Sequence, residues 1–124
     1  MIRRGEIYWV EFDPVKGSEQ GGLRPALVIQ NDTGNRYSPT TVVAAITRTV
    51  PPKPYPFTVI IEPHESGLQA TSAINCSQVA TIQQSGPQSR LRAIPGENGI
   101  RPIGRLSDAK MQEVSEALRF NFGL

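Results

Sequence analysis

The sequence contains one cysteine, Cys76, and one histidine, His64, among its 124 residues. A single cysteine forms no disulfide within the chain, and these two residues fall short of the ligand set of a usual zinc site. A Ser–His or Cys–His hydrolase would need His64, which lies in the turn-rich stretch 62–67 and is expected to be exposed. Cys76 is expected to be a small buried hydrophobic residue. We therefore predict no metal and no cofactor.

Long apolar segments are also missing. No stretch approaches the roughly 20 apolar residues of a membrane-spanning helix. The opening Met-Ile-Arg-Arg-Gly-Glu becomes charged at once and does not resemble a secretory signal. We expect a cytoplasmic protein without membrane association, built as one domain over residues 1–124.

Charge of one sign dominates only part of the chain. The formal net charge is +2 and the isoelectric point is about 9.0, which weakly favours a nucleic-acid partner. The excess of positive charge is greatest in residues 90–110, which contain five basic and two acidic residues. The basic ones are Arg90, Arg92, Arg101, Arg105 and Lys110, and the acidic ones are Glu97 and Asp108. This pattern is typical of a phosphate-binding face and equally of a solvated basic surface.

Glycine and proline are abundant, with eleven of each, and they indicate many turns and few long helices. Segments rich in β-branched and aromatic residues predict strands at 6–12, 25–30, 41–47 and 57–62, and one or two short strands within 72–82, split near Gln78. Short strands at this spacing favour a mainly β fold, either a small barrel or a sandwich.

The end of the chain changes to a helical pattern. Ser107 is a suitable N-cap, and Leu106 with Met111 forms a hydrophobic staple. The apolar stripe at helical spacing comprises Met111, Val114, Leu118 and Phe122. We expect one amphipathic helix, packed on the barrel through this stripe and ended at Gly123.

An eleven-residue loop, residues 13–23, separates the first two predicted strands. A hairpin needs only two to five residues, so the extra length favours a functional loop. Arg24 at its end is held by Pro25 and is suited either to grip a phosphate or to form a salt bridge with Asp13 or Glu19. Thr47 ends a buried strand, where a hydroxyl ordinarily makes a local backbone hydrogen bond.

Several segments resemble the successive motifs of the MazF/PemK toxins, in order and over almost the whole chain. They are residues 5–10 (Gly-Glu-Ile-Tyr-Trp-Val), 17–25 (Gly-Ser-Glu-Gln-Gly-Gly-Leu-Arg-Pro), 28–32 (Val-Ile-Gln-Asn-Asp), 44–47 (Ala-Ala-Ile-Thr) and the helix-bearing tail. The string Ser-Glu-Gln-Gly-Gly-x-Arg-Pro, followed at this distance by Ile-Thr, is the specific part of the resemblance.

The resemblance implies a mainly β fold, a compact SH3-like barrel with a C-terminal amphipathic helix, of the type shared by CcdB, MazF and PemK. It implies a homodimer that cleaves single-stranded RNA, such as mRNA, at short sequences without ribosome or metal. The products would carry 2′,3′-cyclic phosphate and 5′-hydroxyl ends. An acidic antitoxin protein would block the RNA groove.

The same resemblance assigns the catalytic residues Arg24, Thr47 and Glu19. Arg24 would stabilise charge on the phosphorus, Thr47 would bind a non-bridging oxygen, and Glu19 would either accept the 2′-OH proton or orient Arg24. The RNA-binding residues would be Lys16, Ser18, Gln20, Gly21, Asn31, Gln78 and Phe12. Phe12 is a candidate for base stacking, whereas core packing is the expected role of Trp9.

Two other functions remain in view. Gyrase-inhibiting toxins share the fold but act through a C-terminal Trp and Gly, and here Trp9 in the first strand is the only tryptophan. A non-catalytic RNA- or partner-binding barrel is the second alternative. Relatives often carry an acidic and a basic residue at the positions of Ser77 and Ala80, and their absence here favours the non-catalytic barrel. The presence of all three expected catalytic residues argues against that alternative.

Overall fold

The computed structural model describes residues 1–12 and 22–124, and this part of the chain holds seven strands and three helices. The strands are β1 (Glu6–Phe12), β2 (Gly22–Val28), β3 (Thr40–Thr47), β4 (Thr58–Ile61), β5 (Ser72–Gln83), β6 (Leu91–Arg92) and β7 (Gly104–Arg105). The helices are α1 (Asp32–Tyr37), α2 (Pro63–Ser66) and α3 (Asp108–Phe122).

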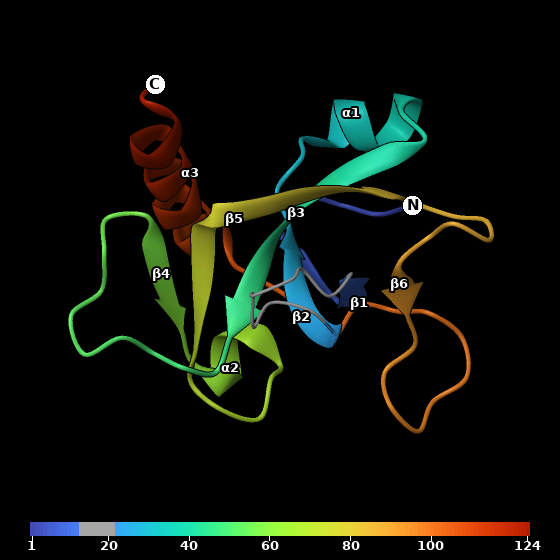
Figure 1. Cartoon of the computed structure of the whole chain (residues 1–124), viewed down its shortest axis with the longest axis horizontal. Coiled ribbons are helices and arrows are strands. Elements are labelled where there is room, and N and C mark those ends of the chain that lie inside the picture. Colours follow the sequence, from blue (N-terminus) through green and yellow to red (C-terminus); the bar gives the residue numbers. More distant parts are fainter. Residues whose placement is uncertain (13–21) are drawn as a thin grey trace.

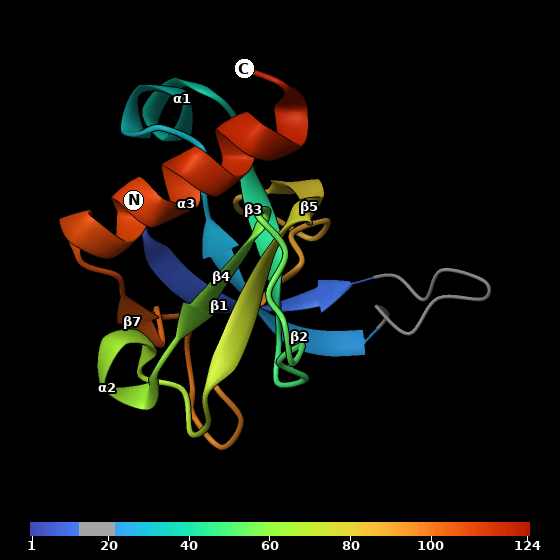
Figure 2. The same cartoon turned by 90° about the vertical axis from the view of Figure 1, so that its left-hand side faces the viewer.

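All the paired strands are antiparallel neighbours in one sheet, in the order β4-β5-β3-β2-β1-β6, with β7 on β1 as well. The sheet curls into a half-barrel, and α3 lies across one of its faces against β4 and β5 (Figures 1 and 2). The mainly β prediction with a C-terminal helix is confirmed.

The predicted strands correspond to β1 to β5, and two of them differ in detail. The segment 72–82 is one continuous strand rather than two. Its pairing with β3 jumps from Ala45↔Asn75 to Ala44↔Val79, so residues 76–78 bulge without a β3 partner. Of the predicted one or two strands the structure has one, and the position near Gln78 where a split was predicted is the bulge in its pairing with β3.

Strand β2 begins at Gly22, three residues before the predicted start. Pro25 lies within it, opposite Trp9 of β1. The pairing of β2 with β3 starts only at Ala26, so the missing N–H of Pro25 interrupts no ladder on that side. Arg24 is consequently a strand residue paired with Val10, not the last residue of a loop.

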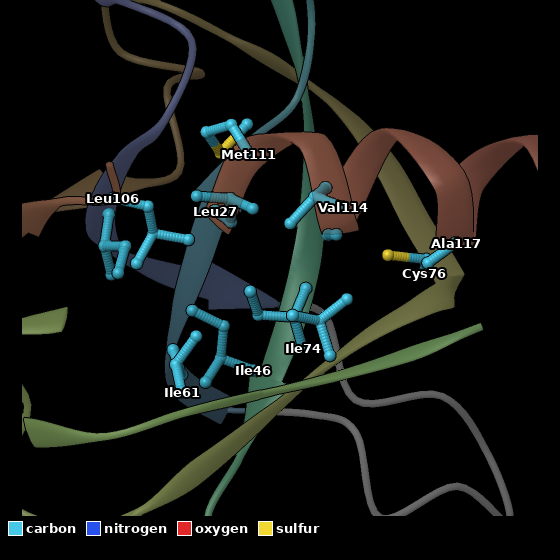
Figure 3. Close-up of a cluster of buried hydrophobic side chains, with 12 residues drawn as sticks. Leu27, Ile46, Ile61, Ile74, Cys76, Leu106, Met111, Val114 and Ala117 are labelled. Carbon is cyan, nitrogen blue, oxygen red and sulfur yellow. The ribbon is translucent and has the colours of Figure 1, made fainter. Parts of the chain in front are cut away.

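The larger hydrophobic core lies between the sheet and α3 (Figure 3). The strands contribute Ile7, Leu27, Ala44, Ile46, Val59, Ile61, Ile74 and Cys76, and the helix side contributes Leu106, Met111, Val114 and Ala117. Ser107 caps the helix by accepting the N–H of Lys110, and Gly123 ends it in the left-handed conformation, as expected.

Phe122 does not belong to the buried stripe, because its side chain is 54% exposed. Ala117 occupies the stripe instead, three residues after Val114. At about 100° per residue, Phe122 is rotated about 140° away from Ala117 and leaves the buried face. Leu118 is only about 40° from the direction of Val114, and it is partly buried.

Cys76 is completely buried in this core, as predicted, and burial raises the pKa of its thiol to about 11. His64 is exposed, also as predicted, although it lies in α2 rather than in a loop. Within residues 1–12 and 22–124 no group of three His, Cys, Asp or Glu side chains is placed to hold a metal ion. No helix in that part has the length and apolarity to cross a membrane.

The opposite face of the sheet carries a smaller cluster. Its buried members are Ile2, Tyr8, Val10, Ala26, Val28, Val43, Ile82 and Leu91. Phe12 and Ala80 pack against it and are only partly buried. Among the described residues no helix contributes to this cluster, and we call this side of the sheet, opposite the one that α3 covers, the open face.

Candidate active site

Arg24 and Thr47 lie at the same end of the sheet on neighbouring strands. Ala26 of β2 is paired with Ala45 of β3. Arg24 lies two residues before Ala26, and Thr47 lies two residues after Ala45. Side chains two positions apart on a strand share a face, as do directly opposed residues. Both side chains are therefore presented on the open face of the sheet, and both are partly buried.

The hydroxyl of Thr47 takes part in one local hydrogen bond. Its Oγ1 accepts the backbone N–H of Thr49 at 3.1 Å, the local bond that a threonine at a strand end commonly makes. A hydroxyl has one hydrogen to donate and two lone pairs, so this bond leaves the O–H as a donor. Thr47 can thus hold a ligand oxygen at this end of the sheet.

Phe12 adds an aromatic surface to the same face. It is the last residue of β1, opposite Gly22, and lies two positions after Val10, the partner of Arg24. Its ring packs on the smaller cluster and is partly exposed. The structure thus brings together three predicted site residues: Arg24, Thr47 and Phe12.

Gln78 is exposed on the β5 bulge, opposite the Ala44–Ala45 step of β3. The adjacent Ser77 is also exposed, and its backbone N–H donates to Asn75 Oδ1 at 3.0 Å. The bulge thus presents two exposed polar side chains on the strand next to the one that carries Thr47.

Asn31 lies away from this group. Its Oδ1 accepts the Gly34 N–H at 2.8 Å and caps α1. Seven residues separate it from Arg24, or about 23 Å of extended chain, so it stands beyond the opposite end of β2. The structure therefore gives Asn31 a capping role and does not bring it to Arg24.

Five predicted residues, Lys16, Ser18, Glu19, Gln20 and Gly21, lie outside the described part of the chain. Phe12 and Gly22, which flank that stretch in sequence, are paired with each other at the end of the sheet that carries Arg24.

The basic stretch 90–110 divides into two parts. Arg101 and Lys110 are paired with carboxylates, Arg101 with Glu97 at 2.7 Å and Lys110 with Glu113 at 3.2 Å. Arg92 donates instead to the carbonyl oxygens of Ser89 and Leu91 at 2.8 and 2.9 Å, and it forms no ion pair with an acid of residues 1–12 or 22–124.

Arg48 is a basic residue that the predicted site omitted. It is exposed and directly follows Thr47. Its side chain makes no hydrogen bond or ion pair with the residues that the structure describes. The one signal in the sequence was its position beside a candidate catalytic residue.

A family model described as "PemK-like, MazF-like toxin of type II toxin-antitoxin system" matches residues 3–122. An endoribonuclease MazF of Staphylococcus saprophyticus subsp. saprophyticus is 41% identical over 124 residues, covering 100% of this chain and 93% of that protein.

Two solved structures show the same fold. MazF from Deinococcus radiodurans matches with a TM-score of 0.73 at 24% identity, covering 99% of this chain and 97% of that one. A mycobacterial endoribonuclease in complex with its cognate antitoxin matches with a TM-score of 0.71 at 20% identity, covering 100% and 97%. With the family model and the Staphylococcus relative, these findings establish that the chain belongs to the PemK-like, MazF-like toxin family.

Proposed function

We propose that this protein is an endoribonuclease toxin that cleaves single-stranded RNA without a metal ion and is neutralised by an antitoxin. The observation that carries the proposal is the placement of Arg24 and Thr47 two positions beyond one strand pair, on one face of the sheet. The name of the Staphylococcus relative, an endoribonuclease 41% identical over the whole chain, supports the same activity.

RNA supplies its own nucleophile, the 2′-OH beside the phosphate. In the proposed reaction the 2′-oxygen bonds to phosphorus and the bond from phosphorus to the 5′-oxygen breaks. The 2′-OH loses a proton and the departing 5′-oxygen gains one, which leaves a 2′,3′-cyclic phosphate and a 5′-hydroxyl. The protein therefore has to orient the phosphate, stabilise its extra negative charge and move protons.

Arg24 stabilises the negative charge that builds up on the phosphate oxygens. A guanidinium offers two parallel N–H donors, and a strand position paired with Val10 fixes the backbone from which they project. Thr47 donates its O–H to a non-bridging oxygen, since the Thr49 N–H already occupies one of its lone pairs. The two groups together hold the phosphate against the open face.

Glu19 completes the proposed set, either as the acceptor of the 2′-OH proton or as the residue that orients Arg24. Lys16, Ser18, Gln20 and Gly21 are proposed to bind the RNA backbone from the same segment. On the described face, Phe12 is proposed to stack on a base and Gln78 to hydrogen-bond to one.

An acidic antitoxin and a second copy of this chain are the proposed protein partners, in the cytoplasm. The structural relative from mycobacteria is named with its cognate antitoxin, and an acidic chain complements a protein with an isoelectric point of about 9.0. Exposed apolar side chains at the end of α3 support an interface between copies: Phe120 (59% exposed), Phe122 (54%) and Leu124 (89%).

The activity is tested by incubating the wild-type protein with a random RNA pool in excess EDTA and sequencing the fragment ends. We expect cuts at a short shared motif, with cyclic phosphate on one side and 5′-hydroxyl on the other. A second substrate carries a single 2′-deoxy nucleotide at the mapped cut and should stay intact there. Folded protein that cuts nothing, or that cuts the deoxy substrate equally, would refute the proposal.

A further inference from the structure

The connection from β6 to β7, residues 93–103, contains the dipeptide Asn98-Gly99. Every residue from 95 to 100 is exposed, and none of them belongs to a helix or a strand. Figure 1 shows this connection in orange at the lower right, where it extends away from the sheet. Asn98 and Gly99 therefore lie at a loop tip that is open to solvent, the part of a fold where the chain is least protected.

The carboxamide of Asn98 is not held by the protein. It makes no hydrogen bond with residues 1–12 or 22–124. An asparagine in a turn ordinarily bonds to the backbone a few residues away, because its side chain carries both donors and an acceptor. Since no such bond fixes Asn98, its side chain is free to rotate toward the main chain that follows it.

The backbone N–H of Gly99 is equally unprotected. It donates to no group in the described part of the chain, and a Cβ built on this residue would have nothing within 4 Å. Its φ is +78°, in the left-handed region that glycine adopts without strain. Because glycine has no side chain, nothing on residue 99 shields its nitrogen from the carboxamide of Asn98.

An ion pair brackets these two residues. Glu97 and Arg101 are joined by two bonds, Nε to Oε1 and Nη2 to Oε2, each of 2.7 Å. The N–H of Glu97 also donates to the Ile94 carbonyl oxygen at 2.9 Å. These contacts tie together the residues on either side of Asn98-Gly99 and leave the dipeptide itself without a bond. The loop thus has a joined base and an unbonded tip.

The other asparagines lack this combination. Asn31 caps α1, Asn35 is buried and hydrogen-bonded, and Asn75 accepts a backbone N–H. Asn121 lies within α3, where the backbone is held in a helix. None of the four precedes a glycine. A free carboxamide next to an unshielded and unbonded backbone nitrogen is therefore found at Asn98 and, among the described asparagines, at no other position.

We propose that Asn98 is a site of spontaneous deamidation, in which the nitrogen of Gly99 displaces the side-chain amide. The Gly99 N–H loses its proton to a base in solution, the nitrogen bonds to Asn98 Cγ, and the Cγ–Nδ2 bond breaks. The displaced nitrogen takes up a proton and leaves as ammonia, and a succinimide ring remains. The attack is intramolecular and needs only a rotation of the side chain, which is why it proceeds without an enzyme.

Water then opens the succinimide at either of its carbonyl carbons. One product is aspartate, and the other is isoaspartate, in which the main chain runs through the former side chain. Overall, one amide and one water give one carboxylate and one ammonium ion. The new carboxylate lowers the formal net charge of +2 by one and stands beside Glu97 as a second acid for Arg101. This inference does not depend on the proposed ribonuclease function.

The first experiment stores the folded wild-type protein for weeks in mildly alkaline buffer, well below its unfolding temperature. Samples are resolved by isoelectric focusing and then mapped by mass spectrometry of peptides. We expect an acidic species whose altered residue is Asn98, with a matching release of ammonia. A purified isoaspartyl methyltransferase with labelled S-adenosylmethionine should label the isoaspartate fraction. Mildly acidic buffer should slow the reaction, because the attacking nitrogen has to lose its proton.

Variants separate this chemistry from general ageing of the protein. Asn98→Gln lengthens the side chain by one carbon, so the attack would have to close a larger ring, and we expect no acidic species. Gly99→Ala places a methyl group beside the nitrogen and should slow the reaction about tenfold or more. Asn121→Gln removes an asparagine that precedes no glycine and should age like the wild type.

A parallel sample in urea measures the reaction of the same chain without its fold. A similar rate in the folded protein upholds the proposal, since it shows that the loop leaves Asn98 unprotected. If Asn98 stays intact in the folded protein while it reacts in urea, the proposal is overturned. Acidic species that map to another residue, or that persist in Asn98→Gln, would overturn it as well.

Discussion

The two ends of strands β2 and β3 use polar side chains in opposite ways. At the α1 end these groups bond to one another: Asn35 is only 3% exposed, its Oδ1 accepts from Thr41 at 2.6 Å and from Gln30 at 3.1 Å, and its Nδ2 donates to the Gln30 carbonyl. Gln84 Nε2 joins the same network through the carbonyl oxygens of Asn35, Ser38 and Thr40 at 2.9, 3.0 and 2.9 Å.

At the other end the polar groups face outward. Thr47 keeps its O–H as a donor, and Arg48 has no bonding partner in the described part of the chain. Buried groups that satisfy each other stabilise the fold, whereas groups held ready for a ligand contribute little to it. The comparison shows that strands β2 and β3 carry a buried hydrogen-bond network at one end, which stabilises the fold. At the other end they carry polar groups that are available to bind a ligand.

The largest expected effect is the loss of activity in Arg24→Ala. Removal of one group that stabilises the charge of the transition state costs about 10²- to 10³-fold in rate. We expect at least that loss in the single-turnover rate of RNA cleavage, with a thermal unfolding midpoint close to that of the wild type. Arg24→Lys keeps the charge but not the paired N–H donors and should recover only part of the rate. Near-normal cleavage by Arg24→Ala would remove this residue from the mechanism.

The next effect belongs to the α1 end. Asn35→Ala leaves the Thr41 hydroxyl and the Gln30 amide without their buried acceptor. Such a loss typically costs about 2–4 kcal/mol in the free energy of unfolding, which urea denaturation measures. Asn98→Ala, at an exposed position, is the matched control and should change the unfolding free energy by less than about 0.5 kcal/mol. Equal stability of the two variants would contradict the structural role of the network.

A smaller effect on the cleavage rate is expected from removing the hydroxyl of Thr47. Thr47→Val keeps the shape but loses the hydroxyl, and we expect the cleavage rate to fall roughly 10- to 100-fold, less than for a charged donor. Thr47→Ser retains the hydroxyl and should cleave within a few-fold of the wild type. If the serine variant were as slow as the valine variant, the hydroxyl would not be the functional group.

The smallest effect is a pH dependence at the α1 end. Asp32 Oδ1 accepts the backbone N–H of Arg4 at 2.7 Å, and this bond lowers the pKa of the carboxyl below its ordinary value of 3.8. A lowered pKa means that the stabilisation is present above the ordinary pKa and is lost as the pH falls through the lowered one. The advantage of the wild type over Asp32→Asn in thermal unfolding should therefore shrink between pH 6 and about pH 3. An advantage that grew with acidity would contradict this assignment.

Local patterns predicted most of the elements, because the β-branched segments of β1 and β3 and the capping residues of α3 act within a few residues of one another. Pro25 misled the prediction of β2, since whether a proline interrupts a sheet depends on which neighbouring strand reaches it. Phe122 was misplaced because a stripe read from spacing alone does not say how far round the helix the core extends.

The site was only partly predictable for the same reason. The roles of Arg24 and Thr47 came from a resemblance, and their shared face follows from a strand register that connects distant residues. A recess of about 350 Å³ at the same end of the sheet, on the opposite face, could not be anticipated, because its lining residues Trp9, Arg48, Leu68 and Ile103 come from four separate segments and form no local pattern.

The central claim is that the α1 end of strands β2 and β3 stabilises the fold and the other end carries the activity. The most direct test measures the RNA cleavage rate per folded molecule of Asn35→Ala and of Arg24→Ala under the same conditions in EDTA. The account predicts wild-type turnover for Asn35→Ala at a temperature where it is folded, and no detectable turnover for Arg24→Ala. Comparable losses in both variants, or cleavage retained by Arg24→Ala, would contradict it.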